Sequence, residues 1–116
     1  MSNPSKRKGS AWEIALREHF LDHSIAVRRN PMNGAQDIGD LSVEINGVHY
    51  VIEAKATKAI DLPGFLKQAE VEARHYASLN RLEEARPLVV VKRRSHGVDR
   101  GYVVQELGWW IHDHTR

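Results

Sequence analysis

Apolar residues along this chain recur with two periods, one typical of helices and one typical of strands. Helical spacing predicts a first helix over residues 9–22 and a second over residues 63–79. The apolar stripes of the two helices consist of Trp12, Ala15, Leu16, Phe20, Phe65, Ala69, Ala73 and Tyr76. Pro63 is favourable in the first turn of a helix and marks the start of the second.

Strands are predicted between and after these helices. Period-two alternation and short apolar runs indicate strands over residues 24–28, 40–45, 48–55, 87–92 and 102–106. Residues 30–37 are rich in turn formers and should form an exposed loop, and residues 108–112 should form a tail. We therefore expect an α/β fold with a mixed central sheet of about five strands flanked by helices.

The Asn46-Gly47 pair predicts the turn of a hairpin and fixes how its two strands pair. The residues on either side of a two-residue turn face each other, and each further pair follows from that register. Counting outward places Asp40 opposite Glu53. One face of the hairpin is then apolar and suits the core, whereas the other face carries Asp40, Glu53 and Lys55.

Two carboxylates opposed on neighbouring strands repel each other, so their charge must be offset. A divalent hard cation would do this, because Mg²⁺ prefers oxygen ligands and commonly binds one or two carboxylates. Lys55, on the same face as Glu53, adds a positive charge. The alternative is that Lys55 merely neutralises an acidic surface pair, since a Glu-x-Lys tripeptide is common by chance.

Composition limits the class of protein. The chain has 116 residues, of which 41% are hydrophobic and 28% charged, and we expect a flexible basic arm over residues 1–8 and one domain over residues 9–116. No membrane span is visible, and the basic N-terminal stretch lacks the apolar part of a secretory signal, so a cytoplasmic protein is expected. Without cysteine, any metal must be held by carboxylates, carbonyls or histidines.

Basic residues are gathered in clusters although the net charge is only +2. The clusters are Lys6 to Lys8, Arg28 with Arg29, and Lys92 to Arg94. Such clusters suit contacts with DNA phosphates, which require no reading of bases. A solvated basic surface is the competing interpretation.

Several segments between residues 8 and 92 occur in a recognisable order. They are Lys8-Gly9 with Glu13, Ala26-Val-Arg-Arg29, Asp40 thirteen residues before Glu53, Ile52-Glu-Ala-Lys-Ala-Thr-Lys58, and Leu88-Val-Val-Val-Lys92. In this order they resemble the PD-(D/E)xK nuclease superfamily, and most closely the archaeal-type Holliday junction resolvases. The resemblance implies a restriction-endonuclease-like fold and a homodimer that binds four-way DNA junctions and nicks two strands symmetrically.

The resemblance also implies roles for individual residues. Mg²⁺, or Mn²⁺ in its place, would be held by Asp40, Glu53 and the carbonyl of Ala54, with Glu13 completing the site from the first helix. Lys55 would position or activate the attacking water and stabilise charge that develops on the phosphate. The DNA contacts expected in this way are Lys8, Arg28, Arg29, Lys58, Gln68 and Lys92.

Some positions depart from the family pattern. Gly39 stands where the motif has proline, and Asn30 and Asn33 stand where resolvases often place serine. These departures bear on the substrate rather than on the chemistry. Asp37, on the same loop, is an alternative ligand, and we prefer Asp40 because Asp37 lies beyond the hairpin.

Other polar residues support weaker hypotheses. His19 and His23 are four residues apart on the first helix, but no third ligand follows at a fixed spacing, so zinc is not expected. His49 lies near the acidic face and could tune the site. Gln68 and Glu72 share one face of the second helix, which either reaches the hairpin or faces solvent.

Three functions fit these observations. The leading one is a junction-resolving endonuclease of DNA recombination and repair, at the nucleoid or at viral replication sites and with no membrane partner. The second is a repair or restriction-like nuclease acting on linear or nicked duplex. The third is a DNA-binding module without chemistry, which the opposed carboxylates disfavour because they would repel DNA. Trp109 and Trp110 near the end of the chain either cap the core or meet a partner.

Overall fold

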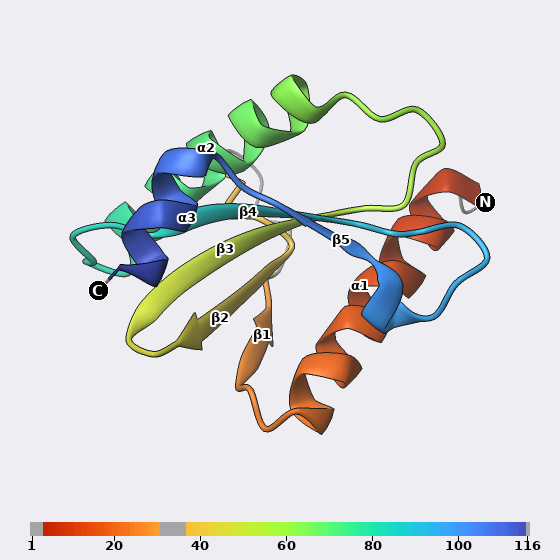
Figure 1. The fold of residues 1–116 in the computed structure, drawn as a ribbon, viewed down its shortest axis with the longest axis horizontal. Coiled ribbons are helices and arrows are strands. Elements are labelled where there is room, and N and C mark those ends of the chain that lie inside the picture. Colours follow the sequence, from red (N-terminus) through yellow and green to blue (C-terminus); the bar gives the residue numbers. More distant parts are fainter. Residues whose placement is uncertain (1–3, 31–36, 116) are drawn as a thin grey trace.

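A computed structural model of the chain describes residues 4–30 and 37–115, with the side chains of residues 4–8 left aside. Its sheet has five strands in the order β1 (Val27–Arg29), β2 (Leu41–Ile45), β3 (Val48–Lys55), β4 (Arg86–Val91) and β5 (Tyr102–Val104). The helices are α1 (Pro4–Asp22), α2 (Leu62–Leu79), the short 3-10 helix η1 (Val98–Arg100) and α3 (Leu107–His114) (Figure 1). Because β3 and β4 are parallel and the other pairs antiparallel, the sheet is mixed, and the predicted α/β fold is confirmed.

The hairpin of β2 and β3 has the predicted register. Its pairs run from Ile45 with Val48 at the turn to Leu41 with Ile52 at the open end. The two turn residues have φ angles of 52° and 80°, the left-handed conformation that Asn-Gly adopts readily in such turns. The regular ladder ends at Leu41, so Asp40 lies one residue beyond it.

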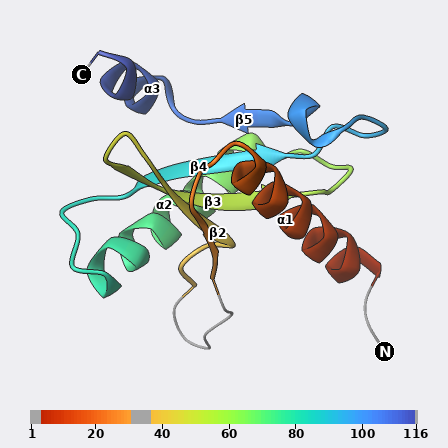
Figure 2. The same ribbon diagram turned by 90° about the horizontal axis from the view of Figure 1, so that it is seen from below.

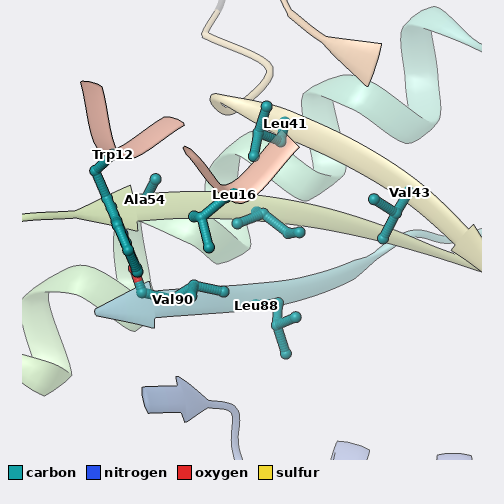
Figure 3. Close-up of a cluster of buried hydrophobic side chains, with 8 residues drawn as sticks. Trp12, Leu16, Leu41, Val43, Ala54, Leu88 and Val90 are labelled. Atoms are coloured by element: carbon teal, nitrogen blue, oxygen red, sulfur yellow. The ribbon is translucent and has the colours of Figure 1, made fainter. Parts of the chain in front are cut away.

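The two faces of the sheet are covered by different helices. On one face, Trp12 and Leu16 of α1 pack against Leu41, Ile52 and neighbouring residues of the sheet (Figure 3). The indole of Trp12 also donates a hydrogen bond of 3.1 Å to the carbonyl of Val90. On the other face, alanines of α2 lie against the valines of β3 and β4. The strand that carries Glu53 is therefore held between the two helices.

The C-terminal part of the chain differs from the prediction. Residues predicted as a tail form α3, which follows β5 along the outer side of β4 (Figure 2). This helix is held through Asp113, which accepts hydrogen bonds from Tyr50 at 2.9 Å and from Arg86 at 2.7 Å. The tail prediction was wrong because these contacts join residues far apart in the sequence.

Other ends of helices and strands also differ from the predicted ones. The first helix begins at Pro4, within the predicted arm, and the first strand begins at Val27 after a turn in which Ser24 has a φ of 60°. The last strand ends at Val104 rather than at residue 106. The predicted exposed loop lies outside the described residues for positions 31–36. Among the helices that the structure describes, none has the length and apolar character needed to cross a membrane.

Candidate active site

Asp40 is fixed to the neighbouring strand at the open end of the hairpin. Its amide donates a hydrogen bond of 3.0 Å to the carbonyl of Ile52, and its Oδ2 accepts one of 2.8 Å from the amide of Ala54. Gly39, the residue before it, has a φ of +87°. Proline, which the family motif has at this position, cannot adopt that conformation. The carboxylate of Asp40 is therefore held against β3 beside Glu53.

Glu53 and Lys55 form an ion pair at the end of β3. The Nζ of Lys55 lies 3.0 Å from Oε2 of Glu53, whose side chain is only 4% exposed. The same Nζ donates to Oε1 of Gln68 at 3.0 Å and lies 5.0 Å from the centre of the Phe65 ring. Because Gln68 and Phe65 both belong to α2, this helix determines where the lysine points.

Glu13 approaches the site from α1 on the other side of the sheet. Its Oε2 accepts a hydrogen bond of 3.0 Å from Arg29 on β1, and its carboxylate is close enough to Asp40 to affect the ionisation of that group. Four predicted site residues, from α1, β3 and the turn before β2, thus meet at one end of the hairpin. They are Glu13, Asp40, Glu53 and Lys55.

The carboxylates of this site are hard to ionise together. Burial, followed by the nearby Glu53 and Glu13, raises the pKa of Asp40 to about 9. Burial, followed by the adjacent Glu72, raises the pKa of Glu53 to about 7 although Lys55 opposes the change. Perturbed acids of this kind are a frequent property of active sites.

Glu72 is a further acid of the site, and its burial shows that the face of the second helix shared by Gln68 and Glu72 reaches the hairpin rather than solvent. It lies on α2, is 2% exposed, and interacts with the carboxyl group of Glu53 and with Gln68. Burial is the main cause that raises its pKa to about 7. Its spacing of four residues from Gln68 was the one available signal, because it places both residues on the face of α2 that meets the sheet.

The acids of the site fit a divalent cation. Several carboxylates gather beside a single ammonium group, and such an excess of buried negative charge is relieved by a hard cation. In the described part of the chain, no three His, Asp or Glu side chains are grouped closely enough to hold a metal by themselves. Mg²⁺ tolerates such a site, because it commonly uses one or two carboxylates and keeps several waters.

The predicted DNA contacts lie around this centre. Arg28 and Arg29 are exposed on β1, whereas Gln68 is hydrogen-bonded to Lys55. Lys58 and Lys92 line a cavity of about 470 Å³, together with Arg93, Arg94 and Tyr102. Lys8 lies within α1, and its side chain is outside the described part. The roles of these residues toward DNA remain predictions.

The remaining candidates lie apart from the site or at its edge. Asp37 lies near Glu72 and accepts a hydrogen bond from the amide of Gly39 at 2.9 Å, which defines the turn before Asp40. The rings of His19 and His23 meet edge to face at 4.8 Å. His49 faces Glu44 near the hairpin turn, at the opposite end from Asp40.

Two pairs of residues named in the sequence analysis lie away from the acids of the site or partly outside the described residues. Trp109 lies over the guanidinium of Arg86 at 4.4 Å, whereas Trp110 is 51% exposed. Asn30 donates a hydrogen bond to the carbonyl of Ile38 at 3.2 Å, and Asn33 is outside the described residues.

Comparison with known proteins identifies a matching family and a solved structure with a similar fold. The model of the family described as archaeal Holliday junction resolvase (hjc) matches residues 4–105. A solved structure of Hjc from Archaeoglobus fulgidus, described as a Holliday junction resolvase from an archaeal hyperthermophile, has a similar fold with a TM-score of 0.56. The two sequences are 16% identical, and the match covers 89% of this chain and 93% of the other. No curated protein matches the chain.

Proposed function

The chain belongs to the archaeal Holliday junction resolvase family and is a structure-specific endonuclease, and we propose that Asp40, Glu53 and Lys55 carry its chemistry. The substrate is branched DNA, and we propose that it is a four-way junction nicked symmetrically. The observation that carries the proposal is the gathering of these three side chains at the open end of the β2–β3 hairpin. A nuclease of branched DNA acts where DNA is replicated and recombined, in agreement with the predicted cytoplasmic location.

The reaction would be hydrolysis of a phosphodiester. A water attacks the phosphorus and loses a proton, the bond to the leaving sugar oxygen breaks, and that oxygen takes up a proton. Negative charge on the phosphate oxygens would be stabilised in the transition state. Asp40, Glu53 and the carbonyl of Ala54 would hold Mg²⁺, or Mn²⁺ in its place, with Glu13 completing the set. Such a cation polarises the phosphate and lowers the pKa of a bound water.

Lys55 would supply the second source of positive charge. Its hydrogen bond to Gln68 and its ion pair with Glu53 hold the ammonium at the site before substrate binds. A preorganised donor of this kind stabilises charge on the reacting phosphate without reorganising. Lys55 would also orient the attacking water.

We propose that the protein acts as a homodimer. Exposed apolar side chains follow one another along the edge strand β5 and the next helix α3, and they are 46–70% exposed. These residues are Tyr102, Val103, Leu107, Trp110 and Ile111. An apolar edge of this kind is typical of a protein interface, and a two-fold copy would provide the second site that paired nicks require.

The proposed activity is tested with a labelled four-way junction and Mg²⁺. Wild type should produce paired, symmetric nicks, and Glu53→Gln should produce none. Glu44→Gln is the matched control, because Glu44 lies on the same hairpin but is exposed near the turn. Equal cleavage of linear or nicked duplex would contradict junction specificity, and a wild type that leaves every DNA intact would overturn the assigned chemistry.

A further inference from the structure

The cavity of about 470 Å³ that Lys58 and Lys92 line is next to the candidate active site. Its walls are the segments that follow β3 and β4, which leave the sheet at the same end (Figure 1). Because these two strands are parallel, the cavity lies outside their carboxyl ends, where α/β sheets commonly bind ligands. Its volume is in the range of roughly 300–1,000 Å³ that is usual for sites of small molecules.

The cavity begins one residue after Lys55. Ala56 is part of its wall, and the amide of Lys92 donates a hydrogen bond of 2.8 Å to the carbonyl of Lys55. A group bound in the cavity would therefore be a neighbour of the phosphate on which Lys55 is proposed to act.

The cavity carries positive charge that the described part of the chain does not neutralise. Its cations are Lys58, Lys92, Arg93 and Arg94, and no acid is among its described lining residues. None of these four side chains forms an ion pair or hydrogen bond within the described ranges, whereas Arg29, Arg74 and Arg86 each pair with an acid. Unpaired cations of this kind suit the phosphate of a nucleic acid.

Tyr102 adds an aromatic ring to these cations. It pairs with Val91 across the sheet, and Val91 packs with Ala69 of α2, so the ring lies on the α2 side of the sheet. The residue is 47% exposed, and Ile60, in the segment that leads into α2, is an apolar neighbour in the wall of the cavity. A phosphate alone does not require an exposed ring and an apolar side chain, whereas a base can stack on them.

We propose that this cavity holds one nucleotide that leaves the stack at the branch point of the junction, with its base on Tyr102 and its phosphate among the four cations. The inference rests on the proposed function, since the branch point supplies the nucleotide. Taking a base out of a duplex costs least where pairing is already disturbed, and stacking on an aromatic ring accepts any base. The cavity would thus favour branched over linear DNA without reading its sequence.

Photochemical crosslinking tests where the base lies. The full chain is bound, without divalent cation, to a four-way junction that carries one iododeoxyuridine at the branch point, in the middle of an arm or at the end of an arm. Irradiation should crosslink the branch-point probe to Tyr102, as identified by mass spectrometry of the peptides. The other two probes should not react with Tyr102. A branch-point probe that fails to crosslink to Tyr102, or one that reacts there no better than the arm probes, would overturn the proposal.

Variants of Tyr102 separate stacking from a structural role. Tyr102→Leu keeps an apolar side chain and should weaken junction binding about tenfold with little effect on linear duplex, whereas Tyr102→Phe keeps the ring and should bind the junction like wild type. Because Tyr102 also belongs to the proposed dimer edge, light scattering and circular dichroism must show wild-type mass and folding for both variants. A correctly assembled Tyr102→Leu that binds the junction like wild type would contradict base stacking.

The salt dependence of binding tests the cations. Arg94→Ala should lower the slope of log affinity against log salt for the junction by about one, because one phosphate contact is lost. Arg100→Ala is the matched control, because Arg100 is an exposed arginine close in sequence that does not line the cavity. An Arg94→Ala slope equal to that of wild type would contradict the placement of the phosphate.

Crosslinking and binding do not depend on cleavage. A wild type that crosslinks through Tyr102 but leaves junctions uncut in Mg²⁺ would contradict the proposed function and retain the cavity as a nucleotide site. A wild type that cuts junctions without this crosslink would do the reverse.

Discussion

Lys55 on β3 donates a hydrogen bond of 3.0 Å to Gln68 on α2. The bond crosses from the sheet to the helix that covers it, so α2 positions the lysine rather than merely packing on the face. Gln68 was predicted as a DNA contact, and its observed position suggests that it acts through Lys55. The two roles lead to different kinetic results.

Removing the lysine should affect the chemical step. Lys55→Met should lower kcat about 10²–10³-fold, because one preorganised charge donor is lost, while Mn²⁺ still binds.

Gln68→Ala should lower kcat about tenfold with little change in the KM for junction DNA, since the lysine remains but is less well held. A raised KM with unchanged kcat would identify Gln68 as a DNA contact instead.

Asp40→Asn should abolish cleavage but raise the free energy of unfolding of the metal-free protein. Burial and the neighbouring acids raise the pKa of Asp40 from 3.8 to about 9. The folded state therefore holds a proton that the unfolded state releases, and stability falls as the pH rises from about 4 to 9. At pH 8 the variant should gain on the order of 1–2 kcal/mol, or several degrees in Tm.

Thermal melts with and without Mg²⁺ check this prediction. Added Mg²⁺ should raise the Tm of wild type and leave that of Asp40→Asn unchanged, because only wild type keeps the ligand. A metal-free variant that melts below wild type at pH 8 would show that Asp40 is ionised and stabilising in the fold.

Metal affinity should increase with pH. The pKa values of about 9 for Asp40 and about 7 for Glu53 mean that an entering cation displaces protons. Mn²⁺ affinity should therefore rise between pH 6 and pH 9, a window set by those two values, and protons should be released on binding. Calorimetry in two buffers of different ionisation enthalpy measures the release, and an affinity independent of pH would contradict the prediction.

A charge on the edge strand should break the proposed dimer. Val103 is 66% exposed in the middle of β5, and Val103→Lys places a charge in the proposed interface without disturbing the core. We expect light scattering to change from dimer to monomer and paired nicking to be lost. Leu79→Lys, at an exposed position of α2, is the control and should remain a dimer. Wild type that is monomeric at micromolar concentration would exclude this interface.

Arg86 should be important for stability. Its guanidinium is 4% exposed, pairs with Asp113 of α3 at 2.7 Å and lies under Trp109. Arg86→Ala should cost about 3–5 kcal/mol, because it leaves a buried carboxylate without its partner. Arg74→Ala, which breaks an exposed pair with Glu70, should cost less than about 1 kcal/mol in the same denaturant melts.

Local patterns were sufficient to predict the centre of the fold. The register of the hairpin followed from the conformation that Asn46 and Gly47 favour, and the structure has that register. The proximity of Asp40 to Glu53 followed from the same count, although Asp40 lies beyond the regular ladder. A short turn determines such pairs because the side chains alternate strictly along each strand.

Contacts between distant segments could not be predicted from local sequence patterns. The helix α3 depends on Asp113, which meets Tyr50 and Arg86 at separations of 63 and 27 residues. The burial of Glu72 likewise depends on how deeply α2 sits on the sheet, which spacing along the helix does not determine. The partner of Arg29 on α1 was missed for the same reason.

The ion pair between Arg29 and Glu13 joins a residue predicted to bind DNA to a residue proposed to bind the metal. In the proposed function, Glu13 turns to the cation and Arg29 to a DNA phosphate, so each must leave the other. Whichever ligand binds first releases the partner that the second requires. Metal and junction would then bind cooperatively, and because such coupling is reciprocal, DNA should strengthen metal binding by the same factor by which metal strengthens DNA binding.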